Sequence, residues 1–227
     1  MDRVAIKTKA KEMIRGNKWY LWKPLVIVGL IVFVIAAIGA GLDAVLGFMK
    51  EETTEVISGV KVTNYSMGPF TAVLSIIDGF IEAAFTVWYC KFLLDFVRGI
   101  KTEFKLASVI EFIKKYWLIC FAASLLVGLN VMIGYILLIV PGIMATFGLM
   151  LYAYVIADDP TLRVTDILRK TWEMTKGHKM ELFILLLSFI GWEFLAGLTF
   201  GILYIWLMPY MAVTLTLAYE SLKGTTR

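Results

Sequence analysis

Residues 75–89 read SIIDGFIEAAFTVWY, and this stretch decides the fold class. It is mostly apolar, yet it carries two acids, Asp78 and Glu82, four positions apart. On a helix this spacing places both carboxylates on one face, together with Ser75 and Thr86. A charged side chain at the centre of a bilayer costs about 2.5–3.5 kcal/mol on insertion scales. If the stretch spans a membrane, its polar stripe must therefore face protein or water rather than lipid.

The composition around this stretch is typical of an integral membrane protein. Of the 227 residues, 60% are hydrophobic and the mean hydropathy is +0.81, whereas a soluble domain is about 45–50% apolar. A helix needs roughly 20 apolar residues to cross a bilayer. Six runs approach this length: 24–47, 70–94, 117–139, 142–157, 182–199 and 202–220. We therefore predict a single all-α membrane domain over residues 1–227, with six transmembrane helices arranged as three hairpins.

The basic residues predict how these spans are oriented. All of the 22 Lys and Arg except Lys50 and Lys61 flank the same ends of the six predicted spans. The positive-inside rule makes that side cytoplasmic, with both the N- and C-termini cytoplasmic, and we place the chain in a bacterial cytoplasmic (inner) membrane. Because the basic residues are spread over the segments beside the spans, the net charge of +4 predicts orientation rather than a nucleic-acid partner.

A cytoplasmic amphipathic helix is predicted ahead of each hairpin. The first covers residues 4–14 and the second 104–113, while the third follows Asp159 as its N-cap and is closed by Gly177. Their apolar faces would insert into the membrane interface while Lys and Arg meet anionic lipid headgroups. Alternatively, the three helices would pack on each other as a cytoplasmic layer.

The segments that enter the three hairpins resemble one another. They read GNKWYLWKPLVIVGL at 16–30, IKKYWLICFAASLLVGL at 113–129 and GHKMELFILLLSFIGW at 177–192. Interface chemistry alone places basic and aromatic residues at the start of any membrane hairpin, and so explains the similarity without repetition. Internal repetition explains it equally well. It predicts three pseudo-repeats, over about 1–99, 100–157 and 158–227.

The largest external segment covers residues 48–69. It contains VISGVKV, which predicts a short β-hairpin that turns at Ser58-Gly59. The segment is too short to form a folded domain of its own.

Three further polar residues fall inside predicted spans, namely Asp43, Asn130 and Glu193. For Asp43 and Asn130 we favour a structural role, as hydrogen-bonded residues that hold helices together. Glu193 lies deeper, and it joins Asp78 and Glu82 as a functional candidate because acids inside a membrane are rare and costly.

No Lys, Arg or His is placed to neutralise these three acids. They are therefore protonated, line a wet cavity, or bind a cation, and the last two cases describe an externally open acidic vestibule. The competing interpretation is that they too only hold helices together. If the vestibule is a binding site, the supporting polar residues are Ser75, Thr86, Asn130 and Asp43.

Catalysis has little support in the sequence. The single histidine, His178, stands beside Lys179 at the end of a predicted cytoplasmic helix, and Cys90 and Cys120 form no CxxC pair. Walker, GxSxG and HExxH motifs are missing from the sequence. We therefore predict no enzyme activity, no catalytic residue, no metal site and no cofactor.

The last third of the chain carries a recognisable set of motifs. They read AYVIADDP at 153–160, ILRKTWEMTKGHKMELFILLLSFIGW at 167–192, LTFGILYIWLMPY at 198–210 and AYESL at 218–222. With these motifs the chain resembles an uncharacterised bacterial membrane-protein family catalogued as domain of unknown function 975. The resemblance implies an N-terminal basic helix followed by about six spans. It implies no activity.

Two functions follow from these observations. The first is a transporter- or channel-like protein with an externally open acidic cavity for cations or a cationic solute. The second is a non-transporting envelope protein that binds lipid, a peptide or a membrane partner through its basic cytoplasmic layer. In both cases the expected partners are the lipid bilayer and anionic lipids at the cytoplasmic face, and the sequence leaves a homo-oligomer open.

Overall fold

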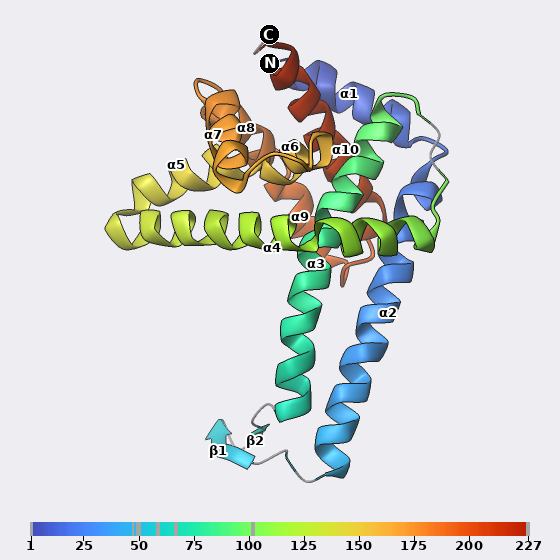
Figure 1. Cartoon of the computed structure of the whole chain (residues 1–227), viewed down its shortest axis with the longest axis vertical. Coiled ribbons are helices and arrows are strands. Elements are labelled where there is room, and N and C mark those ends of the chain that lie inside the picture. Colours follow the sequence, from blue (N-terminus) through green and yellow to red (C-terminus); the bar gives the residue numbers. More distant parts are fainter. Residues whose placement is uncertain are drawn as a thin grey trace. The chain divides into compact units, whose positions relative to one another are not determined.

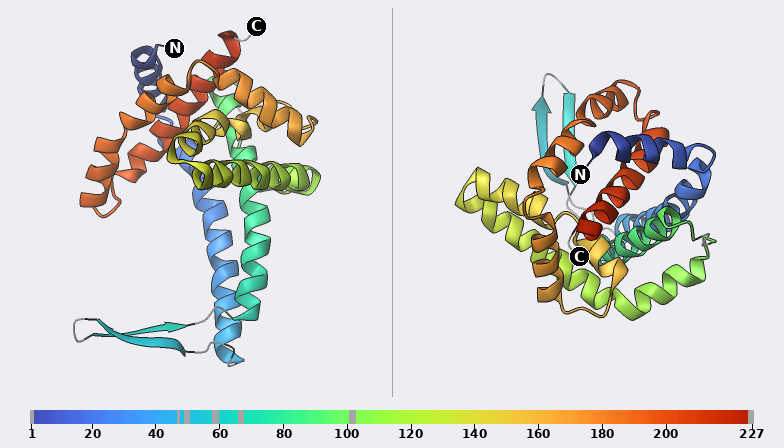
Figure 2. Two further views of the ribbon diagram at one scale, coloured as in Figure 1. Left: turned by 90° about the vertical axis from the view of Figure 1, so that its left-hand side faces the viewer. Right: turned by 90° about the horizontal axis from the view of Figure 1, so that it is seen from above.

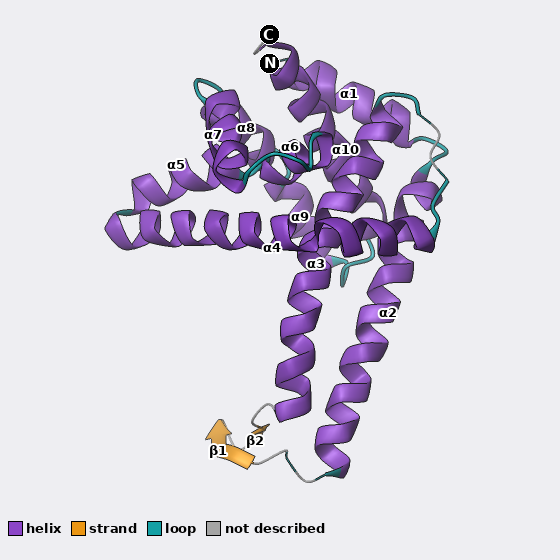
Figure 3. Cartoon of the chain, in the orientation of Figure 1, coloured by secondary structure: helices purple, strands orange, loops and turns teal. Residues whose placement is uncertain are grey.

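The computed structural model describes residues 2–46, 48, 51–57, 60–65, 68–100 and 103–225. Over these ranges the chain forms ten α-helices and one two-stranded sheet (Figures 1 and 3). The elements are α1 (Arg3–Ile14), α2 (Lys18–Val45), β1 (Glu51–Ile57), β2 (Val60–Tyr65), α3 (Pro69–Val97), α4 (Leu106–Leu137), α5 (Ile139–Leu149), α6 (Tyr152–Asp158), α7 (Val164–Thr175), α8 (Lys179–Leu187), α9 (Ile190–Leu198) and α10 (Tyr204–Thr225).

Five helical segments within the described ranges are long and apolar enough to cross a membrane. They are Lys18–Val45, Pro69–Val97, Leu106–Leu137, Ile139–Asp158 and Lys179–Leu198. The sixth predicted span, 202–220, is not among them. It falls on α10, whose apolar residues are interrupted by Pro209, by tyrosines and threonines, and by Glu220. The membrane character of the chain is therefore supported, and the count of six spans is not confirmed.

The chain divides into two compact units, and the smaller one covers Leu25–Glu82. In it, the later part of α2 and the first part of α3 run antiparallel (Figure 1). Gly39 permits their close contact, because a Cβ atom built on it would lie 2.6 Å from Cδ1 of Leu74. The strands β1 and β2, which follow α2 and precede α3 in the sequence, pair antiparallel with each other. This confirms the predicted hairpin, although its turn, Ser58-Gly59, lies outside the described residues.

The larger unit comprises Met1–Pro24 and Ala83–Arg227. Its core is formed around α6, in which every residue from Ala153 to Ala157 is buried. The ring of Tyr154 stacks on that of Tyr219 in α10, with 5.3 Å between centroids. The N-terminal helix α1 packs on α10 as well, and buries Ile6, Ala10 and Ile14 (Figure 2).

Two of the three predicted amphipathic helices are separate helices, and a glycine explains why. The sequences EMIRGNK at 12–18 and EMTKGHK at 173–179 match in pattern. Gly16 after α1 and Gly177 after α7 both have positive φ angles, +90° and +84°. This left-handed conformation suits glycine because it has no Cβ, and it ends a helix.

The second amphipathic helix was predicted as a separate element, and that prediction is wrong. In the corresponding sequence, EFIKKYW at 111–117, Lys115 stands where the other two segments have glycine. Lysine disfavours the left-handed conformation, and α4 runs without a break from Leu106 to Leu137. The threefold repetition itself stays a prediction.

The start of the third amphipathic helix also differs from the prediction. The helix α7 begins at Val164 rather than just after Asp159. The carboxylate of Asp159 accepts hydrogen bonds from the backbone N–H of Thr161 at 3.1 Å and from its hydroxyl at 2.6 Å. Asp159 therefore closes a turn ahead of the helix, which is a common role of this residue type.

Candidate functional site

The first two candidate residues, Asp78 and Glu82, lie one helical turn apart on α3 in the smaller unit. Glu82 and the neighbouring Ser75 and Thr86 are exposed, whereas Asp78 is half-buried. The Oδ1 atom of Asp78 is shielded from solvent and has no hydrogen-bond partner among the described residues. The hydroxyl of Ser75 donates to the carbonyl of Ala72 at 2.9 Å. Asp78 is thus the one acid of this pair with an unsatisfied polar atom.

Asp43 has a structural part in the same unit. Its side chain is fully buried and caps the start of α3. One carboxylate oxygen accepts from the backbone N–H of Phe70 at 3.1 Å, and the other accepts from the N–H and hydroxyl of Thr71 at 2.7 and 2.6 Å. The first N–H groups of a helix have no partner within it, so Asp43 satisfies two of them. Gly68 leaves room for the carboxylate, because a Cβ there would lie 2.1 Å from Cγ of Asp43.

The third candidate, Glu193, belongs to the larger unit. It lies in the first turn of α9, is half-buried, and accepts a hydrogen bond from the hydroxyl of Tyr204. Asn130 donates to the carbonyl of Leu126, one turn earlier on α4, at 2.8 Å. Asp78 and Glu82 are therefore neighbours on one helix, whereas Glu193 is paired with a tyrosine in the other unit. The described residues do not form a site common to all three acids.

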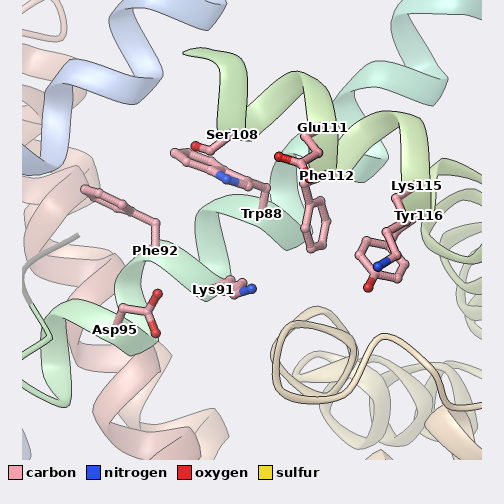
Figure 4. Close-up of a pocket in the computed structure, with 9 residues that line it drawn as sticks. All are labelled: Trp88, Lys91, Phe92, Asp95, Ser108, Glu111, Phe112, Lys115 and Tyr116. Carbon is pink, nitrogen blue, oxygen red and sulfur yellow. The ribbon is translucent and has the colours of Figure 1, made fainter. Parts of the chain in front are cut away.

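A pocket that sequence reasoning missed lies between the last turns of α3 and the first turns of α4 (Figure 4). Both segments belong to the larger unit, and the pocket has a volume of about 350 Å³. Its lining combines four aromatic rings with two lysines, two acids and a serine. These residues are Trp88, Lys91, Phe92 and Asp95 from α3, and Ser108, Glu111, Phe112, Lys115 and Tyr116 from α4.

The charged residues of the pocket follow from helical spacing. Lys91 and Asp95 are four positions apart on α3, and Glu111 and Lys115 are four positions apart on α4. Side chains four apart lie on the same face of a helix, so each helix presents one cation and one anion to the pocket. This spacing was available in the sequence. What the sequence did not show is that the two faces meet.

The aromatic residues form the walls. Trp88 stacks on Phe92 with 5.6 Å between ring centroids, and Phe112 packs on Tyr116 at 5.0 Å. The ammonium of Lys91 lies 6.0 Å from the Phe112 centroid, and that of Lys115 lies 5.2 Å from the Tyr116 centroid. Both lysines are thus beside the same pair of rings, at distances where cation–π attraction operates. Neither forms an ion pair within the described part of the chain.

A second pocket, of about 360 Å³, lies among α4, α5 and α7 and includes Asn130. Its polar lining is completed by Arg169 and Glu173, which are paired with each other at 2.9 Å and are both exposed. Because these two charges neutralise each other, this pocket offers less for a charged ligand than the pocket between α3 and α4.

A charged cluster joins the ends of α3, α6 and α10. Arg98 donates to Asp158 at 2.7 Å and, through Nε, to Glu220 at 3.0 Å. Asp158 also accepts from the hydroxyl of Tyr219 at 2.6 Å and from Lys223. Burial alone would lower the pKa of Arg98, but the two acids raise it above its ordinary value. The cluster holds three helices together and leaves its charges paired.

Metal binding finds no support in the part of the chain that the structure describes, where no group of three or more His, Cys, Asp or Glu side chains gathers. Cys90 and Cys120 are both buried free thiols.

Comparison with known proteins gives one match. Residues 124–226 match the sequence model of a family described as "Protein of unknown function (DUF975)", which confirms the resemblance drawn from the motifs in the last third of the chain. The searches of curated proteins and of solved structures found no match. The matched range starts within α4 and ends beyond α10, so the pocket between α3 and α4 precedes it. Over residues 124–226 the chain is therefore similar to the DUF975 family.

Proposed function

We propose that this chain is a protein of the cytoplasmic (inner) membrane that binds a phosphate-bearing lipid at its cytoplasmic face. The observation that carries the proposal is the pocket between α3 and α4, where two lysines lie beside a wall of aromatic rings and form no ion pair with any described residue. Lysine binds phosphate as a compact point charge. Aromatic side chains favour the boundary between lipid and water. The lining thus suits a ligand with a charged head and an apolar body.

The position of the pocket supports this function. Its charged residues fall within 91–115, a basic segment that the positive-inside rule assigns to the cytoplasm. Lysines near that surface attract anionic headgroups. A volume of about 350 Å³ falls within the usual range for ligand pockets, roughly 300–1,000 Å³.

The packing of the two terminal helices supports the proposed orientation. The contact between α1 and α10 supports placing both ends of the chain on the same side of the membrane. That arrangement requires an even number of crossings. It favours α10 as a sixth crossing in addition to the five segments that are apolar enough by composition.

The proposal is tested by measuring the phospholipid that remains bound to the protein through purification. Native mass spectrometry of the protein in mild detergent should show bound phospholipid on the wild type. The double substitution Lys91→Gln plus Lys115→Gln should weaken phospholipid binding about a hundredfold, since it removes two charge-assisted hydrogen bonds and each is worth about a factor of ten. Lys114→Gln is the matched control, because Lys114 is equally exposed on α4 but does not line the pocket. Equal lipid occupancy in all three proteins would refute the proposal.

A second candidate function, transport of cations or a cationic solute, is favoured by the unsatisfied Oδ1 atom of Asp78. Burying a carboxylate oxygen without a hydrogen-bond donor costs free energy unless a proton, a water molecule or a cation binds to it. Protein in liposomes should then show cation or proton flux that falls on Asp78→Asn plus Glu82→Gln. Absence of flux above empty liposomes would count against this function and leave lipid binding untouched.

A further inference from the structure

We infer that the pocket between α3 and α4 selects a headgroup that carries a primary ammonium as well as a phosphate. This inference rests on the proposed lipid binding and specifies its ligand. Two acids line the pocket together with the two lysines. A purely anionic headgroup would meet repulsion from Glu111, whereas a headgroup with both charges finds a partner for each.

The phosphate position follows from the two lysines. Lys91 comes from α3 and Lys115 from α4, and their ammonium groups lie beside the packed rings of Phe112 and Tyr116 (Figure 4). Side chains from two helices can therefore reach one phosphate from different directions. Their flexible stems and rotatable donors allow this without a fixed geometry.

The ammonium position follows from Glu111 and Ser108, which are three positions apart on α4 and both line the pocket (Figure 4). The hydroxyl proton of Ser108 is already donated to the carbonyl of Lys105, at 2.7 Å, so the oxygen of Ser108 is left as an acceptor. Glu111, when ionised, is also an acceptor only. Trp88 is buried and stacks on Phe85 and Phe92, so it forms an apolar wall beside these acceptors. Two acceptors suit an ammonium that has hydrogens to donate.

This chemistry is shared by a phosphatidylethanolamine-type lipid and by soluble phosphoethanolamine. The experiment separates them with delipidated protein in detergent. Short-chain lipids with ethanolamine, choline or glycerol headgroups and identical acyl chains are titrated against it, and bound lipid is measured by native mass spectrometry. We expect the ethanolamine lipid to bind about tenfold more tightly than the glycerol lipid, as loss of one charged partner implies.

Glu111→Gln should remove this preference, because it weakens binding of the ethanolamine lipid and relieves the repulsion of the glycerol lipid. Glu12→Gln is the control, since Glu12 is exposed on α1 and does not line the pocket. Equal elution and circular dichroism establish that each variant is folded. Competition by soluble phosphoethanolamine at the concentration of the lipid would support the headgroup chemistry and assign the site to a soluble ligand.

Failure of the ammonium inference can be distinguished from failure of the proposed lipid binding. If the glycerol lipid binds as tightly as the ethanolamine lipid in the wild type, the ammonium inference is wrong and lipid binding survives. Binding of the ethanolamine lipid that is unchanged by Glu111→Gln likewise overturns the inference. If no lipid binds at all, the proposed function itself fails.

Discussion

Lys7 of α1 donates a hydrogen bond to the hydroxyl of Ser188, 181 positions later in the chain, at the point where α8 ends and α9 begins. The same ammonium lies 4.4 Å from the centroid of the Phe189 ring. Positive charge near the C-terminus of a helix is favourable because the last carbonyl groups point outward, and Lys7 supplies it to α8. Burial, and then the neighbouring Lys11, lower the pKa of Lys7.

Lys7→Ala should weaken the attachment of α1. We expect a loss of about 1–2 kcal/mol in unfolding free energy, the range for a charge-assisted hydrogen bond at a partly exposed site. It should appear as a lower thermal midpoint in detergent and as faster tryptic cleavage near α1. Lys9→Ala, at an exposed position of the same helix, should change neither. Identical midpoints for the two variants would show that the contact with Ser188 does not anchor α1.

Gly68→Ala should be strongly destabilising because its Cβ would collide with the Asp43 carboxylate. Asp43→Ala alone should cost about 1–2 kcal/mol, the usual range for loss of a helix cap. In the Asp43→Ala background, however, Gly68→Ala should cost much less, since the colliding group is gone. Thermal unfolding of the two single variants and the double variant measures this coupling. Strict additivity would contradict the assigned contact.

Gly177→Ala should lower the unfolding free energy by about 1–2 kcal/mol, because an L-residue is forced into the left-handed conformation there. The φ angle of Gly177 is +84°. Gly191 in α9 is the control, since an added Cβ would meet nothing within 4 Å and alanine favours a helix. Denaturation of both variants in the same detergent checks the prediction, which requires opposite signs for the two substitutions.

Arg98→Lys should weaken the junction of α3, α6 and α10 although it keeps the charge. Lysine has no planar fork to reach Asp158 and Glu220 together. We expect a loss of about 1 kcal/mol, because the site is partly exposed and solvent screens the charges. Arg163→Lys, at an exposed position, should have no measurable effect. A junction that tolerates both substitutions equally would show that the paired geometry of Arg98 is unimportant.

The turn ahead of α7 should make stability depend on acid pH. Hydrogen bonds from the hydroxyl and N–H of Thr161 lower the pKa of Asp159 below its ordinary value of 3.8. A lowered carboxyl pKa contributes stability above the ordinary value and loses it as pH falls through the lowered one. Thr161→Ala should therefore bring the acid transition of this turn to higher pH. Backbone amide shifts of residues near Asp159, followed by NMR during an acid titration, would report it. An unchanged transition would contradict the assignment.

Five of the six apolar runs coincide with helical segments that are long and apolar enough to cross a bilayer, because length and hydropathy can be read directly from the sequence. The sixth run, on α10, is not among these segments, and its apolar residues are interrupted by tyrosines, threonines and Glu220. The β1–β2 hairpin was predictable from local turn chemistry. The uninterrupted α4 was also predictable. It requires aligning the three segments 12–18, 111–117 and 173–179, which shows Lys115 where the other two have glycine.

The binding pocket was harder to predict. Charge spacing on a single helix is visible in sequence, but the pairing of residues 88–95 with 108–116 depends on how the chain turns between α3 and α4. For the acids the difficulty was different, because the acidic residues are visible in the sequence but their hydrogen-bond partners are not. The cost of an acid inside a predicted span drew attention to them, but the capping role of Asp43 depends on the N–H groups of Phe70 and Thr71, 27 and 28 positions later in the chain.

The partition of the chain also has a consequence for biosynthesis. The smaller unit, Leu25–Glu82, is one continuous segment, whereas the larger unit combines Met1–Pro24 with Ala83–Arg227. Chains are made from the N-terminus at about 5–20 residues per second. The helical hairpin can thus assemble early, while α1 must wait on the ribosome-bound chain until α10, its partner, has been translated. During that interval the apolar face of α1 is uncovered. Its lysines would bind α1 to a nearby lipid surface, which would cover that face.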